Sequence, residues 1–244
     1  MKKDNNAQFG NTVRFPTVMD WYPVDSQERF KKLSKEHQGY WNSLPPIKYH
    51  LNEYGFRSGK FPEEETRDSI TFLGCSQTFG LGLHKDKTWA SLVAEHFNLP
   101  EINLSMSGGS LDSAFRVYNE WQPIHKSKIT CLLLPPDARY ESVWPTRPPG
   151  SYKWQNVGSW SVERDRELSD DAKQTILYLL SREIQEVRRD RNISAISYIA
   201  QKNESRLIIL PYTSVGIDSA RDGKHGGFQW NRKMADEFIG KINE

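Results

Sequence analysis

The chain has 244 residues, enough for one α/β domain with elaborations, and its 36% hydrophobic and 26% charged residues are typical of a protein that packs a core. The formal net charge of +2 is too small to indicate a nucleic-acid surface. No stretch approaches the roughly 18 continuous apolar residues of a membrane helix, and the N-terminus lacks the apolar run of a signal peptide.

Cysteine and histidine usage excludes two further classes of protein. The two cysteines, Cys75 and Cys131, are too few for a disulfide framework, and no spacing of cysteine and histidine matches a zinc site. We therefore expect a cytoplasmic protein that uses no metal or other cofactor. We also expect no nucleic-acid partner and no membrane span.

Residues 1–68 are predicted to form a polar and aromatic N-terminal extension that packs on the core, with one short helix beginning near Ser26. From residue 69 onward, strands alternate with helices. The predicted strands are 70–74, 101–104, 129–134 and 206–210, and the predicted helices are 88–97, 111–121, 170–190, 193–202 and 228–242. This alternation predicts an α/β fold with three αβα layers and a mostly parallel sheet, of flavodoxin-like type.

The predicted helix at 170–190 has Ser169 as its N-cap and one apolar stripe. The stripe contains Ala172, Ile176, Leu177, Leu180, Ile184 and Val187. Before this helix, residues 142–165 form an aromatic-rich insertion that we expect to be irregular. Aromatic rings in a long loop suit sugar rings or acyl chains, so Trp144 and Trp154 are candidate substrate-binding residues, unless the insertion only covers the core.

The stretch 70–80 is the most informative part of the chain. A short apolar strand stops at Gly74, and Ser76 follows two residues later, so its hydroxyl is presented at the carboxyl edge of the sheet, where open α/β sheets place their chemistry. Far downstream, Asp222 and His225 lie three residues apart. Because a serine hydroxyl needs an oriented base to act as a nucleophile, these three residues predict a Ser–His–Asp triad. The P-loop lysine is missing, and Thr78 breaks the GxSxG pattern.

From about residue 52 to the C-terminus, the chain resembles the GDSL/SGNH hydrolase family. The resemblance is carried by Asn52-Glu53-Tyr54-Gly55-Phe56-Arg57, Phe72-Leu73-Gly74-Cys75-Ser76-Gln77-Thr78-Phe79-Gly80, Asn103-Leu104-Ser105-Met106-Ser107-Gly108-Gly109-Ser110 and Asp218-Ser219-Ala220-Arg221-Asp222-Gly223-Lys224-His225. It implies an SGNH-type α/β fold in which Ser76 is the nucleophile, His225 the base and Asp222 its partner. It also implies that the backbone amides of Ser76 and Gly108 form the oxyanion hole.

The chain departs from the family pattern at two positions. Cys75 stands where the family has aspartate, and we expect it to be a small buried residue. In the family, a third sequence block follows the strand at 129–134 and supplies an asparagine that donates to the oxyanion. This chain has Pro135-Pro136 there, and a proline nitrogen cannot donate. Arg139 and Asn103 are candidate replacement donors. Arg139 could also bind an acidic substrate group, or form an ion pair with Asp137 or Glu141.

The resemblance and the residues together predict a carboxylic ester hydrolase that acts on a small-molecule ester, with an O-acetylated sugar as the favoured substrate. A lysophospholipase or thioesterase is the alternative enzyme. Because the third oxyanion donor is missing, a protein that keeps the fold for a binding or structural role is the alternative outside enzymes. Loss of one such donor costs about 100- to 1000-fold in turnover.

Overall fold

The computed structural model describes residues 15–62, 64–146, 151–164, 169–212, 216 and 218–244. Its centre is a parallel four-stranded sheet in the order β4-β3-β5-β8. The strands are β3 (Ile70–Leu73), β4 (Glu101–Asn103), β5 (Ile129–Leu133) and β8 (Arg206–Leu210). Ile70 of β3 pairs with Glu101 on one side and Ile129 on the other, so β3 is internal to the sheet. The predicted α/β fold with a parallel sheet is confirmed.

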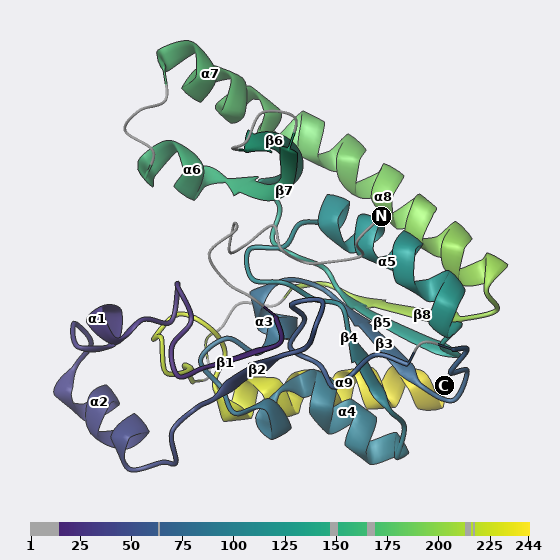
Figure 1. The fold of residues 1–244 in the computed structure, drawn as a ribbon, viewed down its shortest axis with the longest axis horizontal. Helices are drawn as coiled ribbons and strands as arrows, with labels where there is room; N and C mark the ends of the chain where they lie inside the picture. Colours follow the sequence, from purple (N-terminus) through teal and green to yellow (C-terminus); the bar gives the residue numbers. More distant parts are fainter. Residues whose placement is uncertain (1–14, 63, 147–150, 165–168, 213–215, 217) are drawn as a thin grey trace.

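Helices cover both faces of this sheet, which gives three layers (Figure 1). One face carries α4 (Trp89–Phe97) and α9 (Phe228–Asn243), and the other carries α5 (Leu111–His125) and α8 (Arg182–Lys202). Side chains alternate along each strand, so Phe72 packs toward Trp89 and Phe238 while Leu73 packs toward Trp121. The strands are therefore apolar on both faces, as parallel strands between two helical layers have to be.

The predicted helix at 170–190 is interrupted. Ser169 caps α7 (Asp170–Leu179) as expected, but the chain turns at Leu180, and α8 begins after Ser181 and includes the helix predicted at 193–202. Because the turn breaks the helical period, the predicted apolar stripe does not continue. Leu177 is 48% exposed and Val187 is 70% exposed.

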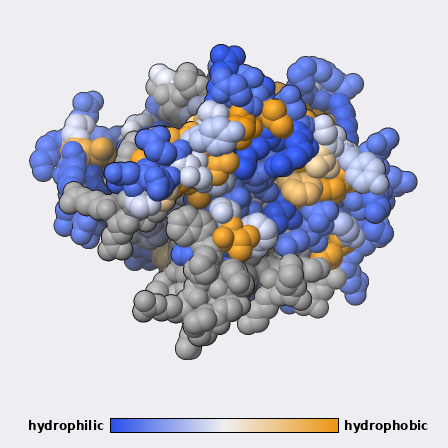
Figure 2. Space-filling model, turned by 90° about the horizontal axis from the view of Figure 1, so that it is seen from above, coloured by the Kyte–Doolittle hydropathy of each residue, from blue (hydrophilic) through white to orange (hydrophobic). Residues whose placement is uncertain are grey.

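Figure 2 views the molecule from above Figure 1, and on this face hydrophobic patches lie among a mainly hydrophilic surface.

The segment predicted to be irregular contains regular structure. It forms an antiparallel hairpin of β6 (Arg139–Thr146) and β7 (Ser151–Gly158), followed by α6 (Ser159–Arg164). The hairpin is fastened to α5 by Arg116, whose guanidinium donates two hydrogen bonds of 2.7 and 2.8 Å to the Glu141 carboxylate. Tertiary contacts of this kind decide whether a Pro- and Gly-containing stretch forms strands, and sequence periodicity does not report them.

Residues 15–62 of the predicted N-terminal extension form short elements that precede the sheet. These elements are β1 (Thr17–Met19), α1 (Gln27–Phe30), α2 (Lys35–Asn42) and β2 (Tyr49–Leu51), with β1 and β2 paired antiparallel and Ser26 capping α1. Apolar residues of the extension share one buried cluster with Phe79, Leu81 and Leu83, which follow the predicted nucleophile, and with Ala220. The extension therefore lies against the two loops that carry the predicted triad. The domain boundary at residue 68 stays a prediction.

Candidate active site

Ser76 is presented by a sharp turn from β3 into the short helix α3 (Ser76–Phe79). The turn requires glycine at position 74, because its φ is +154° and a Cβ there would lie 2.2 Å from the Thr78 hydroxyl oxygen. The first residue of α3 is Ser76, which is 6% exposed and lines a pocket. Cys75 is 1% exposed, which confirms the expectation of a small buried residue.

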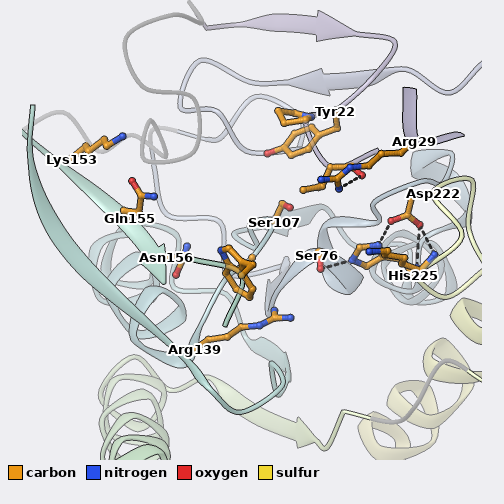
Figure 3. A pocket seen from close by; sticks show the side chains of 15 residues that line it. Tyr22, Arg29, Ser76, Ser107, Arg139, Lys153, Gln155, Asn156, Asp222 and His225 are labelled. Carbon is orange, nitrogen blue, oxygen red and sulfur yellow. Dashed lines mark hydrogen bonds and ion pairs between the residues drawn. The ribbon is translucent and has the colours of Figure 1, made fainter. Parts of the chain in front are cut away.

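Ser76, His225 and Asp222 lie in one hydrogen-bonded row (Figure 3). The Ser76 Oγ is 2.7 Å from His225 Nε2, although the two residues are 149 positions apart in the sequence. On the other side of the imidazole, His225 Nδ1 is 2.6 Å from Asp222 Oδ2. This arrangement directs one ring nitrogen at the hydroxyl while the carboxylate fixes the tautomer of the ring.

Asp222 is held in its charged form. The backbone N–H groups of Lys224 and His225 each donate to its Oδ1 at 3.1 Å. Burial by itself would raise the pKa of this carboxyl, but the hydrogen bond and charge of His225, together with these two N–H groups, outweigh burial and hold the pKa below its ordinary value. A carboxylate that stays ionised can stabilise an imidazolium next to it.

Gly82 brings the loop with Asp222 against the turn that follows the nucleophile. Its carbonyl accepts the Arg221 N–H at 3.0 Å. Gly82 has φ +75°, and a Cβ there would lie 3.1 Å from the backbone nitrogen of Arg221 and 3.2 Å from that of Asp222. Only glycine combines this conformation with such a close approach of two backbones.

The buried side chain of Arg57 donates hydrogen bonds to backbone carbonyls of the same turn. Its guanidinium donates to the Gly80 carbonyl and, at 2.7 Å, to the Leu83 carbonyl. Burial lowers the pKa of Arg57, which nevertheless stacks over the Tyr49 ring at 4.5 Å. Arg57, the last residue of the predicted block at 52–57, thus has a structural role, since it donates to two carbonyls of the turn that follows α3.

The row opens into a pocket of about 370 Å³, a volume within the range of small-molecule sites. Its lining consists of Tyr22, Pro23, Val24, Arg29, Ser76, Ser107, Gly108, Arg139, Lys153, Gln155, Asn156, Trp160, Asp222, Lys224 and His225. Among the described residues, the backbone N–H groups of Ser76 and Gly108 have no acceptor. Both residues line the pocket, and their role as an oxyanion hole stays a prediction.

Two of the predicted substrate-binding residues are placed differently from each other. Arg139 lines the pocket, and its guanidinium lies over the Trp160 ring at 5.1 Å. Trp154 is absent from the lining; it is 41% exposed and packs under Arg116 at 4.9 Å. Its neighbour Lys153, whose side chain points to the opposite face of β7, is part of the lining instead. The side chain of Trp144 lies outside the described part of the structure.

Asn103 does not serve as the replacement donor. Its side-chain nitrogen donates to the Thr78 carbonyl at 3.1 Å and to Glu101 at 3.2 Å, and its oxygen accepts from the Ser105 backbone at 3.1 Å. Asn103 is buried and is not part of the pocket lining. Of the two candidates, only Arg139 lies at the pocket.

Several lining residues were not predicted as site residues. Tyr22 and Arg29 come from the N-terminal extension, and no local pattern links that segment to the sheet edge. Lys153, Asn156 and Trp160 come from the hairpin and α6. Trp160 belongs to the aromatic rings of the insertion that suit a sugar or acyl chain, although only Trp144 and Trp154 were chosen as candidates from it. The polar residues of β7 would have needed a correct strand prediction.

Among the residues that the structure describes, no group of three or more His, Cys, Asp or Glu side chains could hold a metal ion. No described helix is long and apolar enough to cross a membrane.

No family model and no curated protein matches this chain. Solved structures with a similar fold include a protein of the G-D-S-L family from Desulfitobacterium hafniense, with 11% identity over 72% of this chain and 74% of that one and a TM-score of 0.37. The esterase EstA from Pseudoalteromonas sp. has 16% identity over 72% and 97% of the two chains, with a TM-score of 0.36. An acetyl xylan esterase from Butyrivibrio proteoclasticus has 12% identity over 75% and 64%, with a TM-score of 0.38. At these scores, activity has to be argued from the residues of this chain.

Proposed function

We propose that this protein is a serine esterase of the SGNH type, which hydrolyses carboxylic esters with Ser76 as its nucleophile. The observation that carries the proposal is the row of two short hydrogen bonds, 2.7 Å from Ser76 to His225 and 2.6 Å from His225 to Asp222, at the wall of a pocket. A hydroxyl, a base and an orienting carboxylate in this geometry suit acyl transfer.

In the proposed reaction, His225 accepts the Ser76 proton while the serine oxygen attacks the ester carbonyl. The backbone N–H groups of Ser76 and Gly108 donate to the oxyanion of the tetrahedral intermediate. His225 then gives the proton to the leaving alcohol, and a water molecule activated by the same imidazole releases the acid from Ser76. Asp222 stabilises the imidazolium in both halves of the reaction.

A short acyl group on a polar alcohol is the substrate that we favour, and an O-acetylated sugar fits this description. Most residues of the lining carry polar or charged groups, and Tyr22 and Trp160 offer aromatic rings. Long acyl chains, as in a lysophospholipase or long-chain thioesterase, require a longer apolar lining than these residues provide. Pro135 and Pro136 stand where a third oxyanion donor is expected, so we expect modest turnover.

The proposal is tested by turnover of 4-nitrophenyl esters with acyl chains from acetyl to dodecanoyl. We expect the highest kcat/KM for the acetyl ester and a loss of about 10⁴-fold or more in kcat for Ser76→Ala, with little change in melting temperature. Cys75→Ala is the matched control at the adjacent position and should retain turnover. A wild-type protein with no turnover of any ester would instead support a binding role for the fold. Activity lost in Cys75→Ala but kept in Ser76→Ala would exclude Ser76 as the nucleophile.

A further inference from the structure

The charge of the pocket is strongly unbalanced. Among the residues that the structure describes, four cationic side chains line it, namely Arg29, Arg139, Lys153 and Lys224, against the single carboxylate of Asp222. That carboxylate is already committed to His225 at 2.6 Å. The whole chain, in contrast, is almost neutral, with 33 Lys and Arg residues against 31 Asp and Glu residues. The positive charge of the pocket is therefore a local feature and not a consequence of composition.

The ion pairs among the described residues include none of these four cations. None of the four therefore has a carboxylate partner in that part of the chain. The two carboxylates closest to Arg139 in sequence are engaged elsewhere. Glu141 accepts both hydrogen bonds of Arg116, and Asp137 lies 3.8 Å from Arg189. An ion pair of Arg139 with either residue, the structural alternative for this arginine, is thus not formed.

Arg139 is also held in position. Its guanidinium lies over Trp160 at 5.1 Å, and the Trp160 ring packs on Gly158, where a Cβ would approach to 2.3 Å. Figure 3 shows Arg139 extending toward Ser76 from one side of the pocket and Lys153 lying on the hairpin side, away from His225. A planar guanidinium fixed by an aromatic ring, with no carboxylate of its own, is preorganised to bind an oxyanion in a bidentate way.

We propose that the ester substrate carries an acidic group, a carboxylate, sulfate or phosphate, which Arg139 binds beside Ser76, while Lys153 adds positive charge at the hairpin side of the pocket. This inference rests on the proposed esterase function and specifies its substrate class. The acidic group lies on the part of the ester that extends from the reacting carbonyl toward Arg139. The acidic group of the substrate is then the anionic partner that Arg139 and Lys153 lack among the described residues.

Substrates matched in size and different in charge test the proposal. One pair places the charge on the acyl side, 4-nitrophenyl hydrogen succinate against 4-nitrophenyl methyl succinate. A second pair places it on the alcohol side, O-acetylated glucuronic acid against its methyl ester, with O-acetylated glucose 6-phosphate and 6-sulfate to separate the kinds of oxyanion. We expect kcat/KM for the acidic member to exceed that of the neutral member by about tenfold or more in at least one pair.

The preference should depend on these two cations. Arg139→Gln should lower the acidic-to-neutral ratio of kcat/KM by about tenfold, and Lys153→Gln by about threefold, since the lysine is a point charge on a flexible stem. The control is Arg182→Gln, an exposed arginine on α8 that is paired with Glu186, and it should leave the ratio unchanged. Sodium chloride at about 0.5 M should reduce the ratio for the wild type.

The outcomes separate this inference from the proposed function. Ser76-dependent turnover with ratios near one in both pairs, or with a ratio that survives in the Arg139→Gln/Lys153→Gln double variant, overturns the acidic substrate and leaves the esterase. If no ester is turned over, the esterase fails, and calorimetric titration with glucuronate, succinate and glucose 6-phosphate decides the remaining claim. Binding to the wild type that is lost in the double variant supports the oxyanion site, and absence of binding to the wild type overturns it.

Discussion

The position of the Asp222 carboxylate is fixed by hydrogen bonds from residues that follow it closely in the chain. Its carboxylate accepts three hydrogen bonds, from His225 Nδ1 and from the backbone N–H groups of Lys224 and His225. Two of these donors lie within the same tight turn, so the spacing of three residues between Asp222 and His225 itself builds the arrangement. Because the pKa of Asp222 is lowered in the folded protein, its ionised carboxylate stabilises the folded state as well as orienting His225.

Replacement of Asp222 by asparagine should therefore change both stability and activity. A carboxyl with a depressed pKa in the folded state stabilises the fold above its ordinary pKa of 3.8 and loses this contribution as the pH falls through the lower, folded value. We expect Asp222→Asn to lower the free energy of unfolding by about 1–3 kcal/mol at pH 7, with a difference from the wild type that is constant down to about pH 5 and narrows below about pH 4.

Chemical unfolding from pH 3 to pH 8 measures this difference, and kcat on a 4-nitrophenyl ester should fall by about 10³- to 10⁴-fold because the imidazole loses its fixed tautomer. A difference that widens toward acid pH would contradict the depressed pKa. Unchanged kcat would remove Asp222 from the proposed mechanism.

Sequence reasoning succeeds at the residue scale where the chemistry is local. Gly74 and Ser76 lie within one turn, and Asp222 and His225 lie within another, so each half of the row could be predicted from its own block. Lys153 could not be assigned to the site in the same way. Its position depends on the hairpin of β6 and β7, and no local pattern reports where a hairpin docks.

At the scale of elements, a ring of hydrogen bonds joins the N-terminal extension to the loop that carries Asp222. Arg221 donates from its guanidinium to Asp25, at 2.5 Å for the shortest contact, and Tyr49 donates from its hydroxyl to the same carboxylate at 2.5 Å. The Tyr49 oxygen also accepts the Gly82 N–H at 2.8 Å, and the Gly82 carbonyl accepts the Arg221 N–H at 3.0 Å. The ring therefore ties the residue before Asp222 to the turn after Ser76.

Breaking this ring at Asp25 should weaken the fold and the site together. Asp25 is fully buried and the Arg221 side chain is 8% exposed, so Asp25→Ala leaves a buried guanidinium without its partner. We expect a loss of about 3–5 kcal/mol in the free energy of unfolding. We also expect kcat to fall more than KM changes, because Asp222 is adjacent to Arg221 in the chain.

The double variant Asp25→Ala/Arg221→Met is the control, since it removes both charges and should recover part of the lost stability. Equilibrium unfolding of the two variants and the wild type, with kcat measured well below each melting temperature, gives the comparison. Asp25→Ala with wild-type stability and wild-type kcat would show that the extension does not support the loop that carries Asp222 and His225.

The order of elements was also only partly predictable. Apolar runs flanked by glycine or proline identified β3, β5 and β8, because parallel strands buried on both faces are rich in apolar residues, whereas the edge strand β4 was identified with only Ile102 between Glu101 and Asn103. The break between α7 and α8 was missed, since Leu180 and Ser181 interrupt a helical period without a glycine or proline to mark the interruption. Packing against neighbouring elements decides such breaks, and the hairpin of β6 and β7 was missed for the same reason.

At the scale of the whole molecule, the sheet brings together residues that the sequence keeps far apart. The β3 strand is internal to the sheet and presents Ser76 at its carboxyl end, while α9 begins directly after the loop with His225 and covers one face (Figure 1). The hairpin and the N-terminal extension close the pocket from two further sides. Three-layer architecture could be predicted from the alternation of strands and helices, but the closure of the pocket depends on contacts between distant segments.

Labelling with a fluorophosphonate probe tests most directly whether Ser76 is an activated nucleophile. Because such a probe reacts with a serine only when a base removes its proton, labelling reports the chemistry of the row without any assumption about the natural ester. We expect a single adduct, mapped by mass spectrometry to Ser76, that is absent in Ser76→Ala and forms about 10³- to 10⁴-fold more slowly in His225→Ala. No adduct, or an adduct on another residue, would contradict the account.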